Sequence, residues 1–347
     1  FAEACKFAYA KRALLGDPKF VPVDRLLSQL TSQKYAEAAR RLIDDRKTFE
    51  SREHYTGETG FPVDHGTAHA SFLGANGDAI AITSSVNYYF GSSVRTSSGV
   101  VLNNQMDDFS IPGSPNMYGV APSEANFVVA GKRPMSSMSP LVVVGPSGDV
   151  DLVIGGTGGA KITSGVALVS MRNLWQGNNI KEAIDYPRLH HQFLPNRVDV
   201  ETQFPKVYRR QLEEKGHQTF VPKGRFSIIM AITRRNGRVF ANSDFRKGGT
   251  VDGHSAGALF YMAGTKRDEE TPTLPPAMIG QRRGVHQSQQ AAMFRSLRPA
   301  VQIRAPRRIF KSSLLRQDNR AIPSLMRIIE AVSRVQACFA GVKWHLR

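Results

Sequence analysis

The stretch TAHASFLGANGDAIAITSSV, residues 67–86, decides the fold class. Two runs of small, apolar and β-branched residues flank the turn sequence GANGD. Within that turn, the Asn76-Gly77 pair is a strong signal for a two-residue hairpin connection. We therefore expect a β-hairpin, with the first strand beginning at Thr67.

The pattern recurs further along the chain, around PSGD at 146–149 and around Asn-Gly at 236–237. Helical patterns at 162–177 and 205–216 lie between these hairpins, and each is closed by a glycine. Hairpins separated by helices indicate antiparallel sheet with helices packed on it, which is an α+β fold.

Two more helices are expected near the start of the chain. Residues 2–15 are rich in helix formers and stop at the breaker sequence GDP. A second helix is expected over 32–44, with Thr31 as its N-cap. The polar stretch that follows reads as an exposed loop leading into Thr67.

The positive charge is concentrated at the end of the chain. Of the net +17, residues 261–347 contribute +11, from 16 Lys and Arg against 5 Asp and Glu. No aromatic residues are interleaved with these arginines as in a stacking platform for nucleic acid, so a nucleic-acid partner is disfavoured. Cys5 and Cys338 lie too far apart in the sequence to indicate a disulfide framework.

Thr67 is the candidate for chemistry, although a threonine at the start of a strand is usually only a strand residue. In the alternative, its hydroxyl attacks the carbonyl of Gly66, and hydrolysis of the resulting ester leaves threonine as a new N-terminus. Gly66 tolerates the strained backbone that this attack needs. The new α-amino group, with an ordinary pKa of about 7.7 to 8.0, can then take the proton of the hydroxyl beside it.

Four motifs resemble those of the gamma-glutamyltransferases in order and approximate spacing: GTAH at 66–69, NNQMDDFS at 103–110, GKRPMSSMSP at 131–140 and GGTGG at 155–159. The resemblance covers about residues 1–255. It implies the N-terminal-nucleophile hydrolase fold, a four-layer αββα sandwich, incomplete here at its N-terminal side. It also divides the chain into 1–66 (end of a large subunit), 67–257 (small subunit) and 258–347 (a basic tail unlike the family and expected to lack order).

The resemblance implies a reaction in which Thr67 attacks the γ-amide of glutathione or another γ-glutamyl compound. The resulting γ-glutamyl ester passes to water or to an amino acid or dipeptide acceptor. Ser85 supports the nucleophile in this scheme, and Gly158 and Gly159 supply the oxyanion hole.

The donor is a zwitterion and needs partners of both signs. By the same resemblance, Asp108 holds its ammonium group, with help from Asn87 and Gln105. Ser136 and Ser137 hold its α-carboxylate.

No cofactor or metal is implied. His65 and His69 are four residues apart, but the glutamate of a zinc HExxH motif is missing. His190 and His191 are adjacent and are expected to point apart. We interpret these histidines as residues whose ring nitrogens are hydrogen-bonded within the protein, or as surface residues.

Several alternatives stay open. The chain could be a catalytically inactive, truncated relative with a structural or interaction role, or another amide-cleaving hydrolase of the same fold, such as an acylase relative. The arginine with which the family binds the α-carboxylate lies upstream of this sequence, so weak or no catalysis is expected if the chain acts alone. The resemblance implies the extracellular face of the membrane, or secretion, and a heterodimer of the chain's own two subunits.

Overall fold

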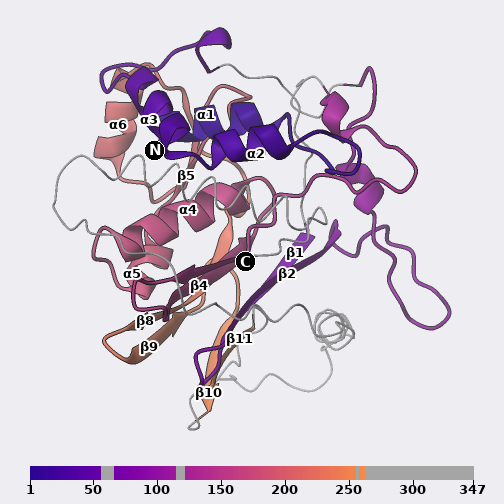
Figure 1. Cartoon of the computed structure of the whole chain (residues 1–347), viewed down its shortest axis with the longest axis vertical. Coiled ribbons are helices and arrows are strands. Elements are labelled where there is room, and N and C mark those ends of the chain that lie inside the picture. The colour runs from indigo at the N-terminus through magenta and orange to yellow at the C-terminus, as the bar shows by residue number, and fades with distance from the viewer. Residues whose placement is uncertain (56–65, 115–121, 255–257, 263–347) are drawn as a thin grey trace, which may run out of the picture.

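The computed structural model describes residues 1–55, 66–114, 122–254 and 258–262. They form an α+β fold built on two four-stranded antiparallel sheets, which pack face to face, and a small three-stranded sheet (Figure 1). The predicted fold class is confirmed. His65 and residues 263–347, which hold most of the predicted tail, lie outside the described residues.

The first sheet has the strand order β10-β11-β1-β2. Its strands are β1 (Gly66–Leu73), β2 (Ala79–Asn87), β10 (Thr250–His254) and β11 (Ala258–Met262). The predicted hairpin joins β1 to β2 and sets Thr67 opposite Ser85, but its turn is longer than the two-residue connection expected. The Gly74 N–H donates to the Asp78 carbonyl at 2.7 Å around residues 75–77, of which only Gly77 has a positive φ, +88°. β11, from the start of the predicted tail, pairs with the second half of β1.

The second sheet has the order β3-β4-β8-β9 and contains the other two predicted hairpins. Its strands are β3 (Leu141–Val144), β4 (Val150–Thr157), β8 (Ile228–Arg235) and β9 (Arg238–Asn242). Asn236 and Gly237 both have positive φ, 51° and 73°, as a type I′ turn requires. The third, small sheet consists of β5 (Leu189–His190), β6 (Val198–Val200) and β7 (Thr219–Phe220).

Helices cover the second sheet on the face turned away from β1. The helices are α1 (Ala2–Arg12), α2 (Asp24–Leu30), α3 (Gln33–Leu42), α4 (Lys161–Leu174), α5 (Ile180–Asp185) and α6 (Lys206–Glu214), with short 3-10 turns η1 (Glu53–Tyr55), η2 (Gln105–Asp108) and η3 (Glu124–Asn126). α4 and α5 contact this sheet directly, and α1 and α3 lie outside them (Figure 1).

The predicted cap of α3 is wrong by one residue. Ser32, not Thr31, is the N-cap, and its Oγ accepts from the Tyr35 backbone N–H at 3.1 Å. Thr31 instead ends α2, where its hydroxyl donates to the Leu27 carbonyl at 2.8 Å. Two helices meet at these residues, and the Ser32 hydroxyl serves both ends, because it also donates to the Gln29 carbonyl of α2 at 2.8 Å.

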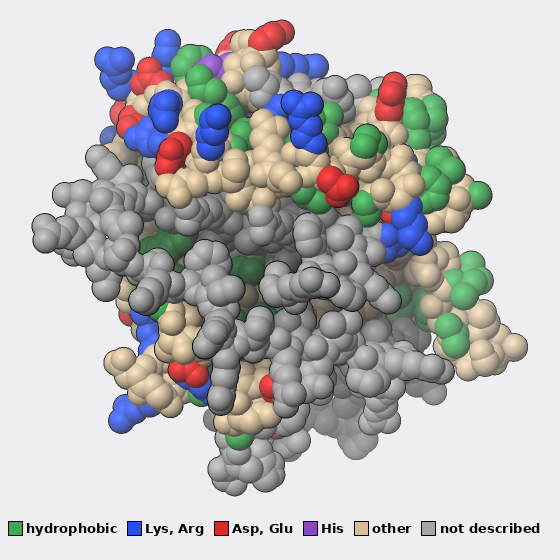
Figure 2. Space-filling view, viewed as in Figure 1, with side chains coloured by type: hydrophobic (Ala, Val, Ile, Leu, Met, Phe, Trp, Pro, Cys, Tyr) green, Lys and Arg blue, Asp and Glu red, His purple; other side chains and the backbone are tan. Residues whose placement is uncertain are grey.

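Charges of both signs are interspersed over α1 to α3, on the face shown in Figure 2. A second surface feature is apolar: large hydrophobic side chains are exposed along the segment that follows β2. They are Tyr88, Tyr89, Phe90, Val94, Val100, Leu102, Met106 and Ile111.

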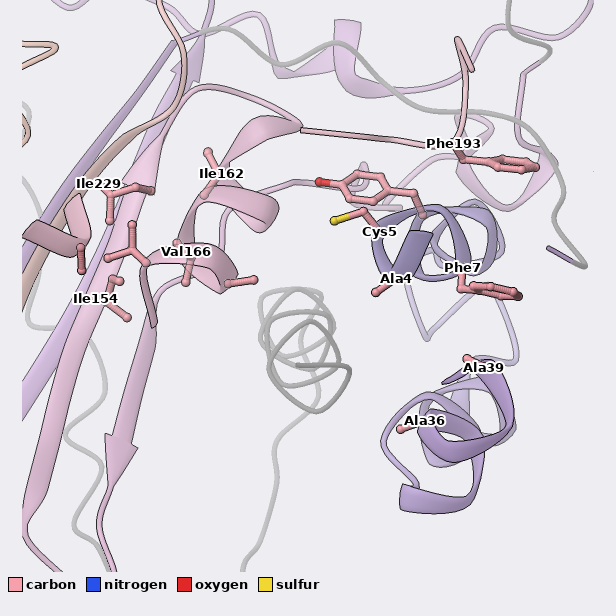
Figure 3. Close-up of a cluster of buried hydrophobic side chains, with 14 of the residues drawn as sticks. Ala4, Cys5, Phe7, Ala36, Ala39, Ile154, Ile162, Val166, Phe193 and Ile229 are labelled. Atoms are coloured by element: carbon pink, nitrogen blue, oxygen red, sulfur yellow. The ribbon is translucent and has the colours of Figure 1, made fainter. Parts of the chain in front are cut away.

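The largest core cluster joins segments from both sides of the Gly66–Thr67 bond. Upstream residues such as Phe7 on α1 and Ala36 on α3 pack in the same cluster as Ile154 on β4 and Val166 on α4 (Figure 3). The two halves of the chain therefore share one hydrophobic core.

A buried ion network fixes the end of the second sheet. Arg188 is 1% exposed; it forms an ion pair with Asp244 and donates to the Ser227 carbonyl at 2.7 Å. Arg246 bonds the other oxygen of Asp244 at 3.0 Å and also pairs with Glu201. All four charged groups are compensated by neighbours, as burial requires.

Removing Asp244 should therefore destabilise the fold strongly. We expect Asp244→Ala to lower the free energy of unfolding by about 3–5 kcal/mol, because it leaves the Arg188 cation buried without its carboxylate. Urea unfolding followed by circular dichroism measures the change. Asp252→Ala, at an exposed position on β10, is the control and should change stability by less than about 0.5 kcal/mol. Equal effects of the two substitutions would contradict this account.

Candidate active site

Thr67 lies at the start of β1, directly opposite Ser85 on β2. Its side chain is half-buried overall, but its Oγ1 atom is fully buried and has no hydrogen-bond partner among the described residues. Side chains alternate along a strand, so Thr67 and His69 point to the same face of β1.

That face is turned toward the second sheet. The ring of His69 lies against Gly155 on β4, where a Cβ atom would come within 2.1 Å of it. Leu73 packs in one cluster with Val153, also on β4. Going back along β1 from Leu73 to His69, the contacted residue on β4 changes from Val153 to Gly155. Thr67 comes next on this face of β1, so it faces the C-terminal end of β4.

The predicted oxyanion loop begins where β4 ends. Gly158 and Gly159 have φ values of +124° and +60°, which favour glycine. A Cβ at Gly158 would also lie 2.8 Å from the Cα of Ser227. The two glycines thus follow the end of β4 that Thr67 faces, and their role as an oxyanion hole stays a prediction.

The carbonyls of both glycines point into the first turn of α4. Gly158 O accepts from the Lys161 N–H at 3.3 Å, and Gly159 O from the Ile162 N–H at 3.0 Å. A trans peptide points its N–H opposite to its C=O, so the N–H of Gly159 points away from α4. Within the described chain neither glycine N–H donates to another group, which leaves both as donors for an anion.

The residues predicted to bind an ammonium group are connected to Ser85. The Asn87 backbone N–H donates to Ser85 Oγ at 2.8 Å, and Asn87 Nδ2 donates to the Asn104 carbonyl at 3.1 Å. From the same segment, Gln105 Nε2 donates to Asp108 Oδ2 at 3.1 Å.

This group of side chains is rich in acceptors. The buried side-chain oxygens of Asn87 and Gln105 accept no hydrogen bond from a described residue, and Asp108 is 3% exposed. A buried carboxylate with amide oxygens nearby is the environment that a cationic donor favours.

The predicted carboxylate-binding serines lie on the loop before β3. Ser136 Oγ accepts from the Met138 N–H at 3.2 Å. Ser137 is buried, and its Oγ accepts from Arg12 Nη2 at 2.8 Å. A buried guanidinium beside this hydroxyl gives the loop a positive field, which favours an anionic group.

The sequence analysis missed two residues that hold this region together. Arg12 extends from α1, upstream of Gly66, to Ser137. Asn126 is fully buried; it donates to the Asp108 carbonyl at 2.7 Å and accepts from the Met135 N–H at 2.9 Å. Nothing in the sequence distinguishes either residue: Arg12 follows Lys11 in a helix that also carries Glu3 and Lys6, and Asn126 lies in no motif.

His69, His190 and His191 are core residues; both ring nitrogens of His69 and His190 have partners, whereas His191 Nε2 has none among the described residues. His69 contacts Thr83 Oγ1 at 2.7 Å and Ser71 Oγ at 3.0 Å, and burial lowers its pKa to about 3. His190 contacts Ser164 Oγ at 2.7 Å, and burial lowers its pKa to about 4.

The adjacent His191 points elsewhere: its Nδ1 accepts from the Phe193 N–H at 3.1 Å. In the part of the chain that the structure describes, no three His, Cys, Asp or Glu side chains form a group that could hold a metal ion.

A sequence profile described as Gamma-glutamyltranspeptidase matches residues 1–254. The chain belongs to the gamma-glutamyltranspeptidase family. The predicted resemblance is thereby confirmed, and the match ends within β10.

Relatives in the family include proteins with different descriptions. The chain is 48% identical over 256 residues to Scoloptoxin SSD14 of Scolopendra dehaani, which covers 73% of this chain and 44% of the relative. It is 39% identical over 259 residues to the glutathione hydrolase proenzyme of Escherichia coli, and the match covers 74% of this chain and 44% of the relative. The chain thus spans less than half the length of these two gamma-glutamyltranspeptidase relatives.

Two further matches concern shorter chains. The putative inactive glutathione hydrolase 4 of Arabidopsis thaliana is 38% identical over 190 residues, covering 54% of this chain and 98% of the relative. The crystal structure of a mutant gamma-glutamyltranspeptidase of Helicobacter pylori matches with a TM-score of 0.49 and 35% identity, covering 52% of this chain and all of the other.

The buried histidines predict how stability depends on pH. The pKa of His69 is about 3 in the folded chain against an ordinary 6.5, so below pH 6.5 the unfolded chain binds a proton that the folded chain does not. Its contribution to stability is complete above pH 6.5 and is lost as the pH falls toward 3.

We expect His69→Gln to remove this titration and to make the fall in unfolding free energy between pH 6 and 4 shallower by about 1.4 kcal/mol per pH unit. Urea unfolding at several pH values gives the two slopes. Because the two slopes of unfolding free energy against pH are compared, any destabilisation by the substitution that does not depend on pH cancels. Identical slopes for the two proteins would show that His69 is protonated in the folded chain.

Proposed function

We propose that the chain is a gamma-glutamyltransferase or glutathione hydrolase that cleaves itself between Gly66 and Thr67. The observation that carries this proposal is the position of Thr67. Its buried hydroxyl lies opposite Ser85 and faces the end of β4, where two glycines of positive φ present free N–H donors. A nucleophile facing preorganised donors is the arrangement that acyl transfer needs.

In the proposed reaction, the Thr67 hydroxyl oxygen attacks the γ-carbonyl carbon of the donor, and its proton passes to the Thr67 α-amino group. The N–H groups of Gly158 and Gly159 stabilise the negative oxygen of the tetrahedral intermediate. The C–N bond then breaks, and the departing amine takes the proton back. Water or the amine of an acceptor attacks the ester that remains and releases Thr67.

Donor selectivity is proposed to come from two groups of opposite polarity. Asp108, Asn87 and Gln105 supply acceptors for the α-ammonium group, and Ser136 and Ser137 supply donors for the α-carboxylate. The Arg12 cation behind Ser137 strengthens the second group. Together they favour a γ-glutamyl donor such as glutathione over an uncharged acyl amide, which the alternative acylase-like function would prefer.

The inactive alternative has its own support, because a shorter relative, 98% of which matches 54% of this chain, is described as putatively inactive. The chain nevertheless retains the candidate functional groups, which argues against inactivity. They are the hydroxyls of Thr67 and Ser85, the carboxylate of Asp108 and the glycines Gly158 and Gly159. Acceptors, the two-subunit state and a location outside the cell remain parts of the proposal. Among the described residues, no helix combines the length and apolar character needed to cross a membrane.

Self-cleavage is the first test. Intact mass and N-terminal sequencing of the purified chain should reveal a fragment beginning Thr-Ala-His. Thr67→Ser, which keeps a hydroxyl, should still be cut, and Thr67→Ala should stay whole. An uncut parent chain would overturn the proposal, and a Thr67→Ala chain cut at the same bond would attribute the cleavage to another protease.

Donor selectivity is the second test. With the self-cleaved protein, we expect Asp108→Asn to reduce the preference for a γ-glutamyl anilide over an uncharged acyl anilide by about 10- to 100-fold, because a charge-assisted hydrogen bond is lost. The neighbouring Asp107→Asn, at an exposed position, is the matched control and should leave the ratio unchanged. No preference for the γ-glutamyl anilide in the parent protein would instead favour the acylase-like function.

A further inference from the structure

A buried phenol on α1 is bonded to the start of α4. Tyr9 is 2% exposed, and its hydroxyl donates to the Ala160 carbonyl at 2.5 Å. Burial raises the pKa of Tyr9, so the phenol stays protonated and able to donate. The edge of its ring meets His190, at 5.5 Å between ring centroids, which fixes the orientation of the phenol.

The Ala160 carbonyl belongs to a chain of aligned peptide groups. Ala160 C=O and Lys161 N–H are one peptide unit, and that N–H donates to Gly158 O at 3.3 Å. Gly158 C=O and Gly159 N–H are the next peptide unit. The hydrogen bond from Tyr9 thus begins a relay through two peptide units that ends at the Gly159 N–H.

Hydrogen bonds in such a relay polarise one another, and each also fixes the plane of the next peptide group. A donor to the Ala160 carbonyl therefore makes the Gly159 N–H a stronger donor and holds its direction. The other side of this loop is rigid as well, because the Ser227 backbone lies where a Cβ of Gly158 would be. Arg188 in turn bonds the Ser227 hydroxyl at 3.0 Å.

We propose that Tyr9 is a positioning residue for the oxyanion donor Gly159, acting through the Ala160 and Lys161 peptide groups. This inference rests on the proposed function of Thr67, Gly158 and Gly159. Tyr9 precedes the Gly66–Thr67 bond and Gly159 follows it. After self-cleavage, a side chain of the upstream piece thus maintains the oxyanion hole of the downstream piece.

Tyr9→Phe isolates this effect, since it removes the hydroxyl and keeps the ring that packs against His190. Tyr55→Phe is the matched control. It also removes a buried phenolic hydroxyl, but that hydroxyl donates to Glu3 Oε2 at 2.7 Å and, among the described residues, to no carbonyl at the start of α4. A merely structural role of Tyr9 would make the two variants behave alike.

The decisive readout compares two ligands of the self-cleaved protein. A boronate carrying the amino-acid head of the donor mimics the tetrahedral intermediate, whereas glutamate mimics only the ground state. We expect Tyr9→Phe to weaken boronate binding by about tenfold and to leave glutamate binding unchanged. In Tyr55→Phe, both affinities should match those of the parent protein. Calorimetry, with concentrations corrected for the folded fraction, measures both.

A second readout does not require turnover. In a spectrum of the ¹⁵N-glycine-labelled protein, the Gly159 amide proton should move upfield in Tyr9→Phe and stay in place in Tyr55→Phe. Unchanged boronate affinity with an unmoved Gly159 signal would overturn the inference and leave the proposed function intact. A parent protein that neither cleaves itself nor binds the boronate would overturn the proposed function and this inference with it.

Discussion

The close contact between His69 and Gly155 determines how the two sheets can meet. An imidazole occupies the space that any side chain on that part of β4 would need, so the sheets approach closely beneath the nucleophile. Thr83 and Ser71 bond both ring nitrogens, which allows a polar residue to be buried there without an unsatisfied group. Thr67 lies two residues before His69 on the same face of β1, so this packing also holds Thr67 against the second sheet.

The candidate site is assembled by buried polar bonds between distant segments rather than by one continuous loop. Asn126 connects the segment of Asp108 to that of the serine pair, and Arg12 connects the serine pair to α1. Each bond lies in a region with little water, where a misplaced partner would cost the desolvation energy of a polar group. The site geometry is thereby tied to the correct folding of both halves of the chain.

The sequence predicted the elements that depend on local chemistry. Both hairpins predicted at Asn-Gly pairs are present: Asn236 and Gly237 both take positive φ, whereas in the first hairpin only Gly77 does and the Asn76 side chain bonds Asp78. The motifs also named candidate site residues, and of these Ser85 lies directly opposite Thr67. The bridging role of Asn126 and the contact of Tyr9 with Ala160 could not be predicted from the sequence. Both depend on the packing of segments that lie far apart in the chain. The cap of α3 was misplaced because Thr31 and Ser32 are both good capping residues, and only the junction with α2 decides between them.

The hydrophobic core that combines residues from both sides of Gly66–Thr67 has a thermodynamic consequence. While that bond is intact, folding is unimolecular. Once it is broken, the same contacts become an interface between two polypeptides, and heat or denaturant would separate the pieces as well as unfold them. In the proposed self-cleavage the chain would fold first and be cut afterwards, and the midpoint of unfolding would rise with protein concentration only after the cut.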